Sequence, residues 1–447
     1  MYRFLRIGAA ALFLCLFFPC CVLAAPRLQE TEDKIVIVID PGHGGGNQGT
    51  TENYHVEKYM TMTTALAMYE ELSLYDNVEV YLTRTEDLDI SLKKRAEYAK
   101  SVDADYMFSI HYNASANNEL FGSEVWVSAF APYNAYGYQF GSVLLTDMRE
   151  LGLLARGVKT RLGDKGLDYY GIIRESVNLE VPAVIIEHCH VDEPRDAVFC
   201  DSDEKLKEFG RLDATAVAKY FGLKSKTLEV DYSDFELAEA SADTPAAPTV
   251  IDATKPEVCQ IEFLGADYEN GFLSLTVTAA DYDGTLLYYS YSTNGGYTFS
   301  QREVWPGSDT LTGRYSDTFT LNLNIQPGTA PDVIVRAYNI YDLYTESNLY
   351  ESPRVFPDPA EEPDTESVPG GISGDHASSP DTEEPEQAEP REEGNSARFV
   401  SFLLLCLTVA SIMLVLVIIS QFISRRRRKK RRLQQRKDVG KKRYQHK

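Results

Sequence analysis

The chain has 447 residues, more than one hydrophobic core usually needs, which predicts two folded domains with additional segments. It carries 44 basic and 67 acidic residues, and 14 of the basic residues but only one acid lie from Ser424 onward. The rest of the chain therefore holds 30 basic and 66 acidic residues, a net charge of −36, which argues against nucleic acid or another polyanion as its partner.

The chain opens with a segment typical of exported proteins. Two arginines within residues 1–6 precede an apolar run from Ile7 to Leu23, which ends in Ala24 and Ala25. A charged start, an apolar centre and a small-residue exit predict a signal peptide over residues 1–24. A retained N-terminal anchor is the alternative, and the small residues at the exit favour cleavage.

Residues 34–224 alternate between two kinds of hydrophobic pattern. Strand-like runs occupy residues 34–40, 78–84, 105–111, 123–128 and 183–187, and helical periodicity marks residues 61–74, 91–102, 140–153 and 204–221. Strands separated by helices predict an α/β domain with an open, mostly parallel sheet and helices on both faces.

The composition changes after this domain. Residues 225–255 are rich in Asp, Glu, Ala, Ser, Thr and Pro and are predicted to be a linker. Alternating runs punctuated by Asn-Gly and Asp-Gly then predict tight hairpin turns and a small antiparallel β-sandwich, immunoglobulin-like or fibronectin-like, over residues 256–356. Acidic, Pro-rich residues 357–397 cannot bury a core and are predicted to be a disordered, extended stalk.

A second apolar run lies near the C-terminus. Residues 399–423 are 25 residues without a charge, enough for a transmembrane helix. The basic block 425–432 follows directly and predicts that the tail, residues 424–447, is cytoplasmic and contacts anionic lipid headgroups. A nucleic-acid-binding role for this block is the weaker interpretation. We therefore expect a single-pass protein of the cell membrane whose folded domains are extracellular.

Four residues carry the predicted chemistry. His43 lies in the glycine-rich turn Asp40-Pro-Gly-His43-Gly-Gly-Gly46 after the first strand, and Glu57 begins the next helix. His111 and Glu187 end two later strands. Ligand sites in open α/β sheets form where strands end, so these side chains are expected at one rim.

Two histidines and a carboxylate form the ligand set of a catalytic zinc site, with one tetrahedral position left for water. Bound Zn²⁺ lowers the pKa of that water toward about 7 and polarises a carbonyl group. A second carboxylate can pass the proton of the water to a leaving amine, and we assign this general acid/base role to Glu187.

These motifs resemble the zinc-dependent N-acetylmuramoyl-L-alanine amidase family over residues 34–222. The matching features are Asp-Pro-Gly-His-Gly-Gly, the glutamate that opens the next helix, Ser-Ile-His111-Tyr-Asn, and Pro-Ala-Val-Ile-Ile-Glu187. Arg84-Thr-Glu-Asp87 with Arg95 is also similar to the family's connecting segment. The run His188-Cys189-His190 departs from the family, which more often has a small and then an aromatic residue there.

The resemblance implies that His43, Glu57 and His111 bind one zinc ion and that Glu187 is the catalytic residue. The substrate it implies is peptidoglycan, cut at the amide between N-acetylmuramic acid and L-alanine. Two alternatives remain open: a zinc peptidase or deacetylase acting on wall polymers, and a non-catalytic surface binding protein. A protein or glycan partner for the sandwich is also left open.

Several other residues have competing interpretations. His55 could replace Glu57 as a ligand, but residues two apart on a helix point in different directions. His188 and His190 are expected to be structural, and Cys189 to be a small buried residue that shares a strand face with Glu187. Asp40 either caps the turn or orients His43. A bridge between Cys189 and Cys200 is left undecided.

Two aromatic features are predicted to be structural. The run Tyr288-Tyr-Ser-Tyr291 is more typical of an ordinary strand than of a carbohydrate-stacking platform. Trp126 is expected in the core.

Overall fold

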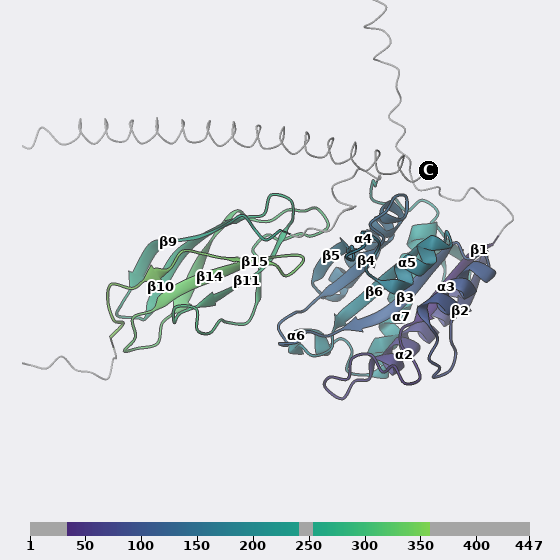
Figure 1. Ribbon diagram of the computed structural model, residues 1–447, viewed down its shortest axis with the longest axis horizontal. Helices are drawn as coiled ribbons and strands as arrows, with labels where there is room; N and C mark the ends of the chain where they lie inside the picture. The colour runs from purple at the N-terminus through teal and green to yellow at the C-terminus, as the bar shows by residue number, and fades with distance from the viewer. Residues whose placement is uncertain (1–33, 241–253, 358–447) are drawn as a thin grey trace, which may run out of the picture. The chain divides into compact units, whose positions relative to one another are not determined.

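The computed structural model describes residues 34–240 and 254–357 (Figure 1). The predicted signal peptide 1–24, transmembrane segment 399–423 and tail 424–447 lie outside these residues, and so does the predicted stalk except its first residue. Within the two described ranges, no helix is both long enough and apolar enough to cross a bilayer.

The first domain is built on one six-stranded sheet with the strand order β2-β1-β3-β6-β4-β5 (Figure 1). Its strands are β1 (Ile35–Pro41), β2 (Val78–Leu82), β3 (Tyr106–Asn113), β4 (Ser123–Val127), β5 (Ala155–Thr160) and β6 (Ala183–His190). Four neighbouring strands, β2, β1, β3 and β6, are parallel. β4 pairs with β6 in the antiparallel sense and with β5 in the parallel sense. The predicted mostly parallel sheet is therefore mixed, because two strands at one side run the opposite way.

Helices cover both faces of this sheet, as predicted. They are α2 (Glu57–Leu72), α3 (Leu92–Ser101), α4 (Tyr133–Leu151), α5 (Gly171–Asn178), α6 (Pro194–Ala197) and α7 (Asp203–Phe221). α2, α4 and α7 share one hydrophobic core with the sheet, and α3 and α5 form a second core on the other face.

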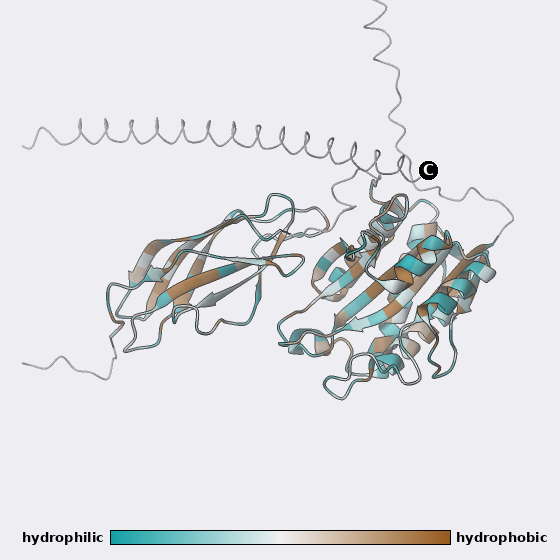
Figure 2. Cartoon of the chain, in the orientation of Figure 1, coloured by the Kyte–Doolittle hydropathy of each residue, from teal (hydrophilic) through white to brown (hydrophobic). Residues whose placement is uncertain are grey.

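Alternation along β1 explains why both cores form. Ile37 and Ile39 belong to the larger core and Val38 to the smaller one, because successive strand residues point to opposite faces. All three are fully buried, and each such side chain contributes about 1.5–3 kcal/mol by leaving water. Figure 2 shows apolar residues along the strands of this sheet.

Two elements of the first domain differ from the prediction. The pattern did not predict β5, whose Arg156 and Lys159 are charged yet almost fully buried. It also did not predict the short helix α5, and it placed the start of α4 at residue 140 rather than Tyr133.

The first domain also continues past residue 224, where the sequence predicted that a linker begins. The short strands β7 (Lys224–Ser225) and β8 (Val230–Asp231) pair with each other. Leu228, Phe235 and Leu237 pack against the larger core, so the chain up to about residue 240 belongs to this domain. The sequence predicted a linker here because the apolar residues of this segment are few and separated by polar ones.

The second domain consists of two antiparallel β-sheets. One has the order β13-β10-β9 and the other β12-β11-β14-β15, with β16 beside β14. Its strands are β9 (Val258–Asp267), β10 (Phe272–Ala280), β11 (Leu286–Ser292), β12 (Glu303–Val304), β13 (Thr318–Asn324), β14 (Asp332–Asn339), β15 (Tyr344–Glu346) and β16 (Tyr350–Glu351). Residues of β10 and β14 share one core with the fully buried Trp305, so the sheets pack face to face.

The turn signals in this domain have different outcomes. Asn270-Gly271 joins the paired strands β9 and β10, as a hairpin turn should. Asp283-Gly284 does not form a hairpin, because it joins β10 to β11, which lie in different sheets. Asn294-Gly295 lies in a longer loop between β11 and β12.

Candidate metal centre and active site

Three strand ends bring the predicted site residues to one rim of the sheet. His43 follows β1 by two residues, and His111 and Glu187 lie near the ends of β3 and β6. Glu57 is the first residue of α2, which packs against these strands. Parallel strands place their carboxyl ends at one edge of the sheet, which is why His43 and Glu187, 144 positions apart in the chain, lie at the same edge.

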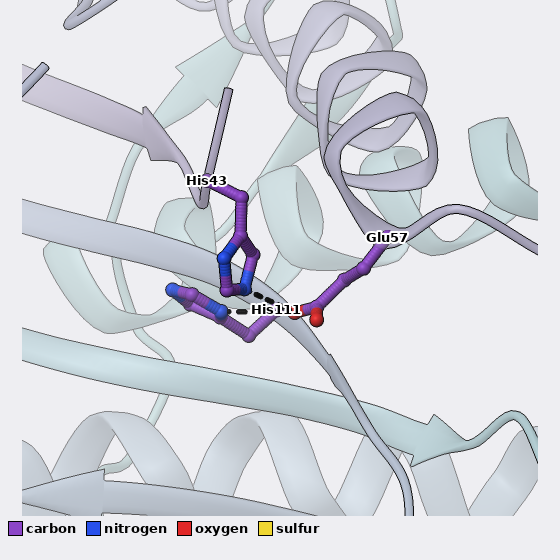
Figure 3. Close-up of side chains that lie close together, drawn as sticks. All are labelled: His43, Glu57 and His111. Atoms are coloured by element: carbon purple, nitrogen blue, oxygen red, sulfur yellow. Dashed lines mark hydrogen bonds and ion pairs between the residues drawn. The ribbon is translucent and has the colours of Figure 1, made fainter. Parts of the chain in front are cut away.

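The structure brings His43, Glu57 and His111 together (Figure 3). Oε1 of Glu57 is 3.0 Å from Nε2 of His43 and 3.0 Å from Nδ1 of His111. The two imidazole rings are nearly perpendicular, with centroids 4.9 Å apart. One ligand atom from each residue lies within 4.8 Å of the others, so the three could face a common ion.

The donor set fits zinc. Two imidazole nitrogens and one carboxylate oxygen are ordinary zinc ligands, and a tetrahedral ion with bonds of about 2.0–2.1 Å holds its ligand atoms about 3.3 Å apart. The separations of 3.0 Å from Glu57 to each histidine are close to that spacing. Both histidine side chains are 20% exposed, so the cluster is open to solvent on one side.

Electrostatics favour a negative Glu57 in this setting. Burial would raise the pKa of Glu57, but hydrogen bonds and charge interactions with His111 and His43 outweigh it and hold the pKa well below its usual range. Burial would lower the pKa of His43, but its hydrogen bond and charge interaction with Glu57 raise it overall. The carboxylate therefore stays ionised and attracts cations.

Backbone amides also hold the carboxylate of Glu57. The N–H of Tyr112 donates to Oε1 at 3.1 Å, and the N–H of Thr50 donates to Oε2 at 2.9 Å. Hydrogen bonds to the charged form favour ionisation and fix the orientation of the group. Glu57 is thus held toward the two rings.

Asn47 orients the ring of His43. Nδ1 of His43 lies 3.0 Å from Oδ1 of Asn47, so Nδ1 donates and Nε2 is left to face Glu57. A partner on the far nitrogen fixes the tautomer of a metal-binding histidine. His43 also adopts a φ of +62°, a left-handed conformation that is uncommon for a residue with a side chain. Asn47 was not among the residues predicted from the sequence; its place four residues after His43 in the glycine-rich turn was the available signal.

Two buried arginines fix the backbone of the turn that carries His43. Arg95 donates to Oδ1 of Asp40 at 2.7 Å and to the carbonyl of His43 at 2.6 Å. Arg84 donates to the carbonyls of Pro41 and Gly42 at 2.9 and 2.8 Å. Asp40 therefore neither caps the turn nor touches the ring of His43; it acts on His43 through Arg95.

Glu187 lies beside this cluster on the next strand. Its Cα is in register with that of His111 across the β3–β6 pair. Burial, followed by the negative charges of Glu57 and Glu124, raises the pKa of Glu187 well above its usual range. Its Oε2 is buried and has no hydrogen-bond partner among the residues that the structure describes. Glu187 therefore has a carboxyl oxygen that no described residue occupies.

The neighbouring candidates have other roles. His188 and His190 are fully buried, and His188 contacts Asp213 at 2.9 Å and the carbonyl of His111 at 3.0 Å. Cys189 is buried, and Cys189 and Cys200 are free thiols rather than a disulfide. His55 precedes α2 and is not part of the cluster.

Fold and site together define a class. An α/β sheet that presents two histidines and a glutamate able to hold a metal ion, with a second glutamate beside them, is typical of metal-dependent hydrolases. Known proteins place the chain within that class. The sequence profile of the family described as N-acetylmuramoyl-L-alanine amidase matches residues 37–219.

Two curated relatives share the first domain. N-acetylmuramoyl-L-alanine amidase CwlM of Bacillus licheniformis is 33% identical over 219 residues, which cover 48% of this chain and 80% of the relative. The sporulation-specific N-acetylmuramoyl-L-alanine amidase of Bacillus subtilis is 30% identical over 218 residues, with 48% and 80% covered. The chain therefore belongs to the N-acetylmuramoyl-L-alanine amidase family and is a hydrolase of that family.

A solved structure is also similar. The catalytic domain of CwlV, an N-acetylmuramoyl-L-alanine amidase from Bacillus (Paenibacillus) polymyxa var. colistinus, is 25% identical with a TM-score of 0.37. The match covers 42% of this chain and 99% of that domain. The residues that match the family profile end before the second domain.

Proposed function

We propose that this protein is a zinc-dependent amidase that cleaves the amide between N-acetylmuramic acid and L-alanine in peptidoglycan. One Zn²⁺ would be held by His43, Glu57 and His111. The observation that carries this proposal is the single carboxylate oxygen of Glu57, 3.0 Å from an imidazole nitrogen of each histidine. The named amidase activity of relatives 33% and 30% identical supports the choice of bond.

When bound, zinc supplies Lewis-acid polarisation of the scissile carbonyl and a water of lowered pKa. Asn47 keeps His43 in the tautomer that presents Nε2, and Tyr112 and Thr50 hold the carboxylate of Glu57. These contacts favour the orientation in which the three side chains could face one ion. The chain therefore contributes preorganisation to the reaction.

Glu187 would move the proton. Its carboxylate accepts a proton from the attacking water, whose oxygen bonds to the lactyl carbonyl carbon. The same proton is then given to the alanine nitrogen as the carbon–nitrogen bond breaks, so the products are a lactyl carboxylic acid and a free amine. Burial and the negative charges of Glu57 and Glu124 raise the pKa of Glu187, which favours its role as the acid in the second step. The positive charge of a bound zinc ion would favour the ionised form that the first step needs.

We also propose that the enzyme is tethered to the outer face of the cell membrane. The charge-free run 399–423 and the basic block 425–432 support a single span with a cytoplasmic tail. The 41 residues of the acidic stalk could extend to about 130 Å, which would let the folded domains act on wall layers above the membrane.

Digestion of purified peptidoglycan tests the proposed bond. Mass spectrometry should detect intact stem peptides with a free L-alanine amino terminus and glycan strands without peptides. New amino termini within the stem would instead indicate a peptidase, and loss of acetyl groups a deacetylase.

The site is tested by Glu187→Ala in the full chain, compared with the wild type for metal content and turnover. We expect stoichiometric zinc in both proteins and a loss of turnover of about 10²–10⁴-fold in the variant. A wild-type protein that lacks zinc and releases no peptide would leave only a binding role.

A further inference from the structure

Arg156 on β5 connects the first domain to the second through a buried guanidinium group. Nε donates to Oε2 of Glu124 at 2.8 Å within the first domain. Nη1 donates to the hydroxyl of Tyr288 at 2.7 Å, and Nη2 donates to Oδ2 of Asp342 at 2.8 Å, both in the second domain. The side chain of Arg156 is only 2% exposed and that of Glu124 4%, whereas that of Asp342 is 27% exposed.

Glu124 carries this connection toward the active site. Its Cα is in register with that of Glu187 across the antiparallel β4–β6 pair. Oε1 of Glu124 accepts from the amide of Asn113 at 3.1 Å, and Asn113 ends β3 two residues after His111. Glu124 thus contacts β3, the strand that carries the proposed zinc ligand His111, and lies opposite Glu187, the proposed acid/base, on β6.

Both domains contribute charged groups to this cluster. Arg156 and Lys159 are two buried cations of the first domain, and both contact Oε2 of Glu124, at 2.8 and 2.7 Å. Asp342 supplies the second negative charge from the sandwich. Without it, Glu124 would be the single carboxylate facing two desolvated cations, and removal of one partner from a buried ion pair is strongly unfavourable.

Buried apolar side chains surround the contact between Arg156 and the second domain. Tyr288 is fully buried in a small cluster with Phe121, Leu287 and Tyr338, and its hydroxyl donates to the carbonyl of Phe121. Tyr288 is therefore a buried strand residue, as predicted, and its ring is not available to stack on a carbohydrate. Thr310 donates to the carbonyl of Ala155 at 2.9 Å, next to Arg156.

The loop between β14 and β15 is shaped to present Asp342. Asp342 adopts a φ of +63°, which is uncommon for a residue other than glycine. Tyr341 and Leu343 flank Asp342, and their N–H groups both donate to Oδ1 of Asn339, at 3.1 Å each. Oδ1 of Asp342 also accepts from Arg302 at 2.9 Å. The sandwich therefore holds this carboxylate in one place.

We propose that the β-sandwich is a working part of the catalytic unit, in which Asp342 and Tyr288 are positioning residues. Asp342 and Tyr288 accept hydrogen bonds from Arg156 and fix its guanidinium group. Arg156 in turn fixes the carboxylate of Glu124. Glu124 then positions the ends of β3 and β6, which carry His111 and Glu187. This inference rests on the proposed amidase function, because it concerns the geometry of that same site. It gives the second domain a role beyond that of a spacer.

The test compares Asp342→Asn with Asp309→Asn in the full, zinc-loaded chain, on a soluble muramoyl-peptide substrate. Asp309 is a matched control, because it pairs with Arg149 of the first domain at 3.6 Å and does not touch Arg156. We expect Asp342→Asn to lower kcat about fivefold or more with KM changed less than twofold, and Asp309→Asn to leave both within twofold. Asp342→Glu should recover part of the kcat.

Tyr288→Phe provides an independent variant that keeps the ring and removes only the hydroxyl. It should lower kcat in the same direction at a temperature well below its unfolding midpoint, with zinc content near that of Asp309→Asn. Equal kcat values for the Asp342, Tyr288 and Asp309 variants would overturn the proposal, as would a loss of kcat explained by loss of zinc. Peptide release by the wild type is measured first. If the wild type releases no peptide, the proposed amidase function fails, whatever the variants do.

Discussion

A Cβ atom at Gly42 would lie 2.4 Å from Cε1 and 2.6 Å from Nε2 of His111. The backbone of the turn after β1 therefore lies directly against the ring of a proposed zinc ligand. Real Cβ atoms essentially never approach other atoms this closely, so any side chain at residue 42 must displace the ring.

Gly42→Ala should therefore weaken zinc binding and turnover together. We expect about 10–100-fold weaker zinc affinity and a turnover reduced on the order of 10²-fold, because small misplacements of reacting groups are costly. Competition with a chromophoric chelator measures the affinity. Gly46→Ala is the control, since a Cβ there meets nothing within 4 Å. Equal zinc affinities for the two variants would contradict the described packing.

Arg95→Ala should destabilise the fold as well as the site. Arg95 and Asp40 form a buried ion pair at 2.7 Å with side chains 3% and 2% exposed, and Arg95 also holds the carbonyl of His43. Removal of one partner from such a pair costs about 3–5 kcal/mol of unfolding free energy. Urea denaturation measures this loss. Lys93→Ala, on the exposed face of the same helix, should change stability by no more than about 0.5 kcal/mol.

Removal of the metal should have a larger effect on stability at pH 8 than at pH 6. In the metal-free protein the pKa of His43 is raised, so its stabilising contribution is present below about pH 6.5 and is lost as the pH rises through the raised pKa. Zinc requires the neutral imidazole, so its binding strengthens as the pH rises. Both effects widen the gap between the metal-loaded and metal-free proteins at pH 8.

Thermal unfolding with zinc and with a chelator measures this gap. With free zinc at about 1,000 times its Kd, the stabilisation is about 4 kcal/mol, or roughly 10 °C for a domain of this size. His55→Ala, which alters a histidine outside the cluster, should show the same pH trend as the wild type. A gap that is constant or that shrinks between pH 6 and pH 8 would argue against His43 as a ligand.

Much of the first domain follows from sequence pattern. The β-branched run of β1 and the helical spacing of α2 and α7 are local signals, and they predict both the elements and the rim where the site lies. β5 has no such signal, because Arg156 and Lys159 are neutralised by Glu124 and Asp342, partners that are distant in the chain. Burial of charge is decided by tertiary contacts that no local pattern contains.

The site shows the same division. His43, Glu57 and His111 were predictable because each stands at the end or start of a regular element. The support around them was not, since Arg95 donates to the carboxylate of Asp40 and the carbonyl of His43, 55 and 52 residues away, and Asn47 acts through a turn conformation. The antiparallel pairing of β4 with β6, which sets Glu124 opposite Glu187, is likewise a property of the sheet as a whole.

The most direct test of the central claim is an anomalous-diffraction map, collected at the zinc edge, of the protein crystallised with zinc. We predict one strong peak in the first domain, bonded to Nε2 of His43, Nδ1 of His111 and a carboxylate oxygen of Glu57, with Glu187 nearby but unbonded. A peak at other residues, or one that Glu57 does not reach, would contradict the proposed zinc centre and the chemistry built on it.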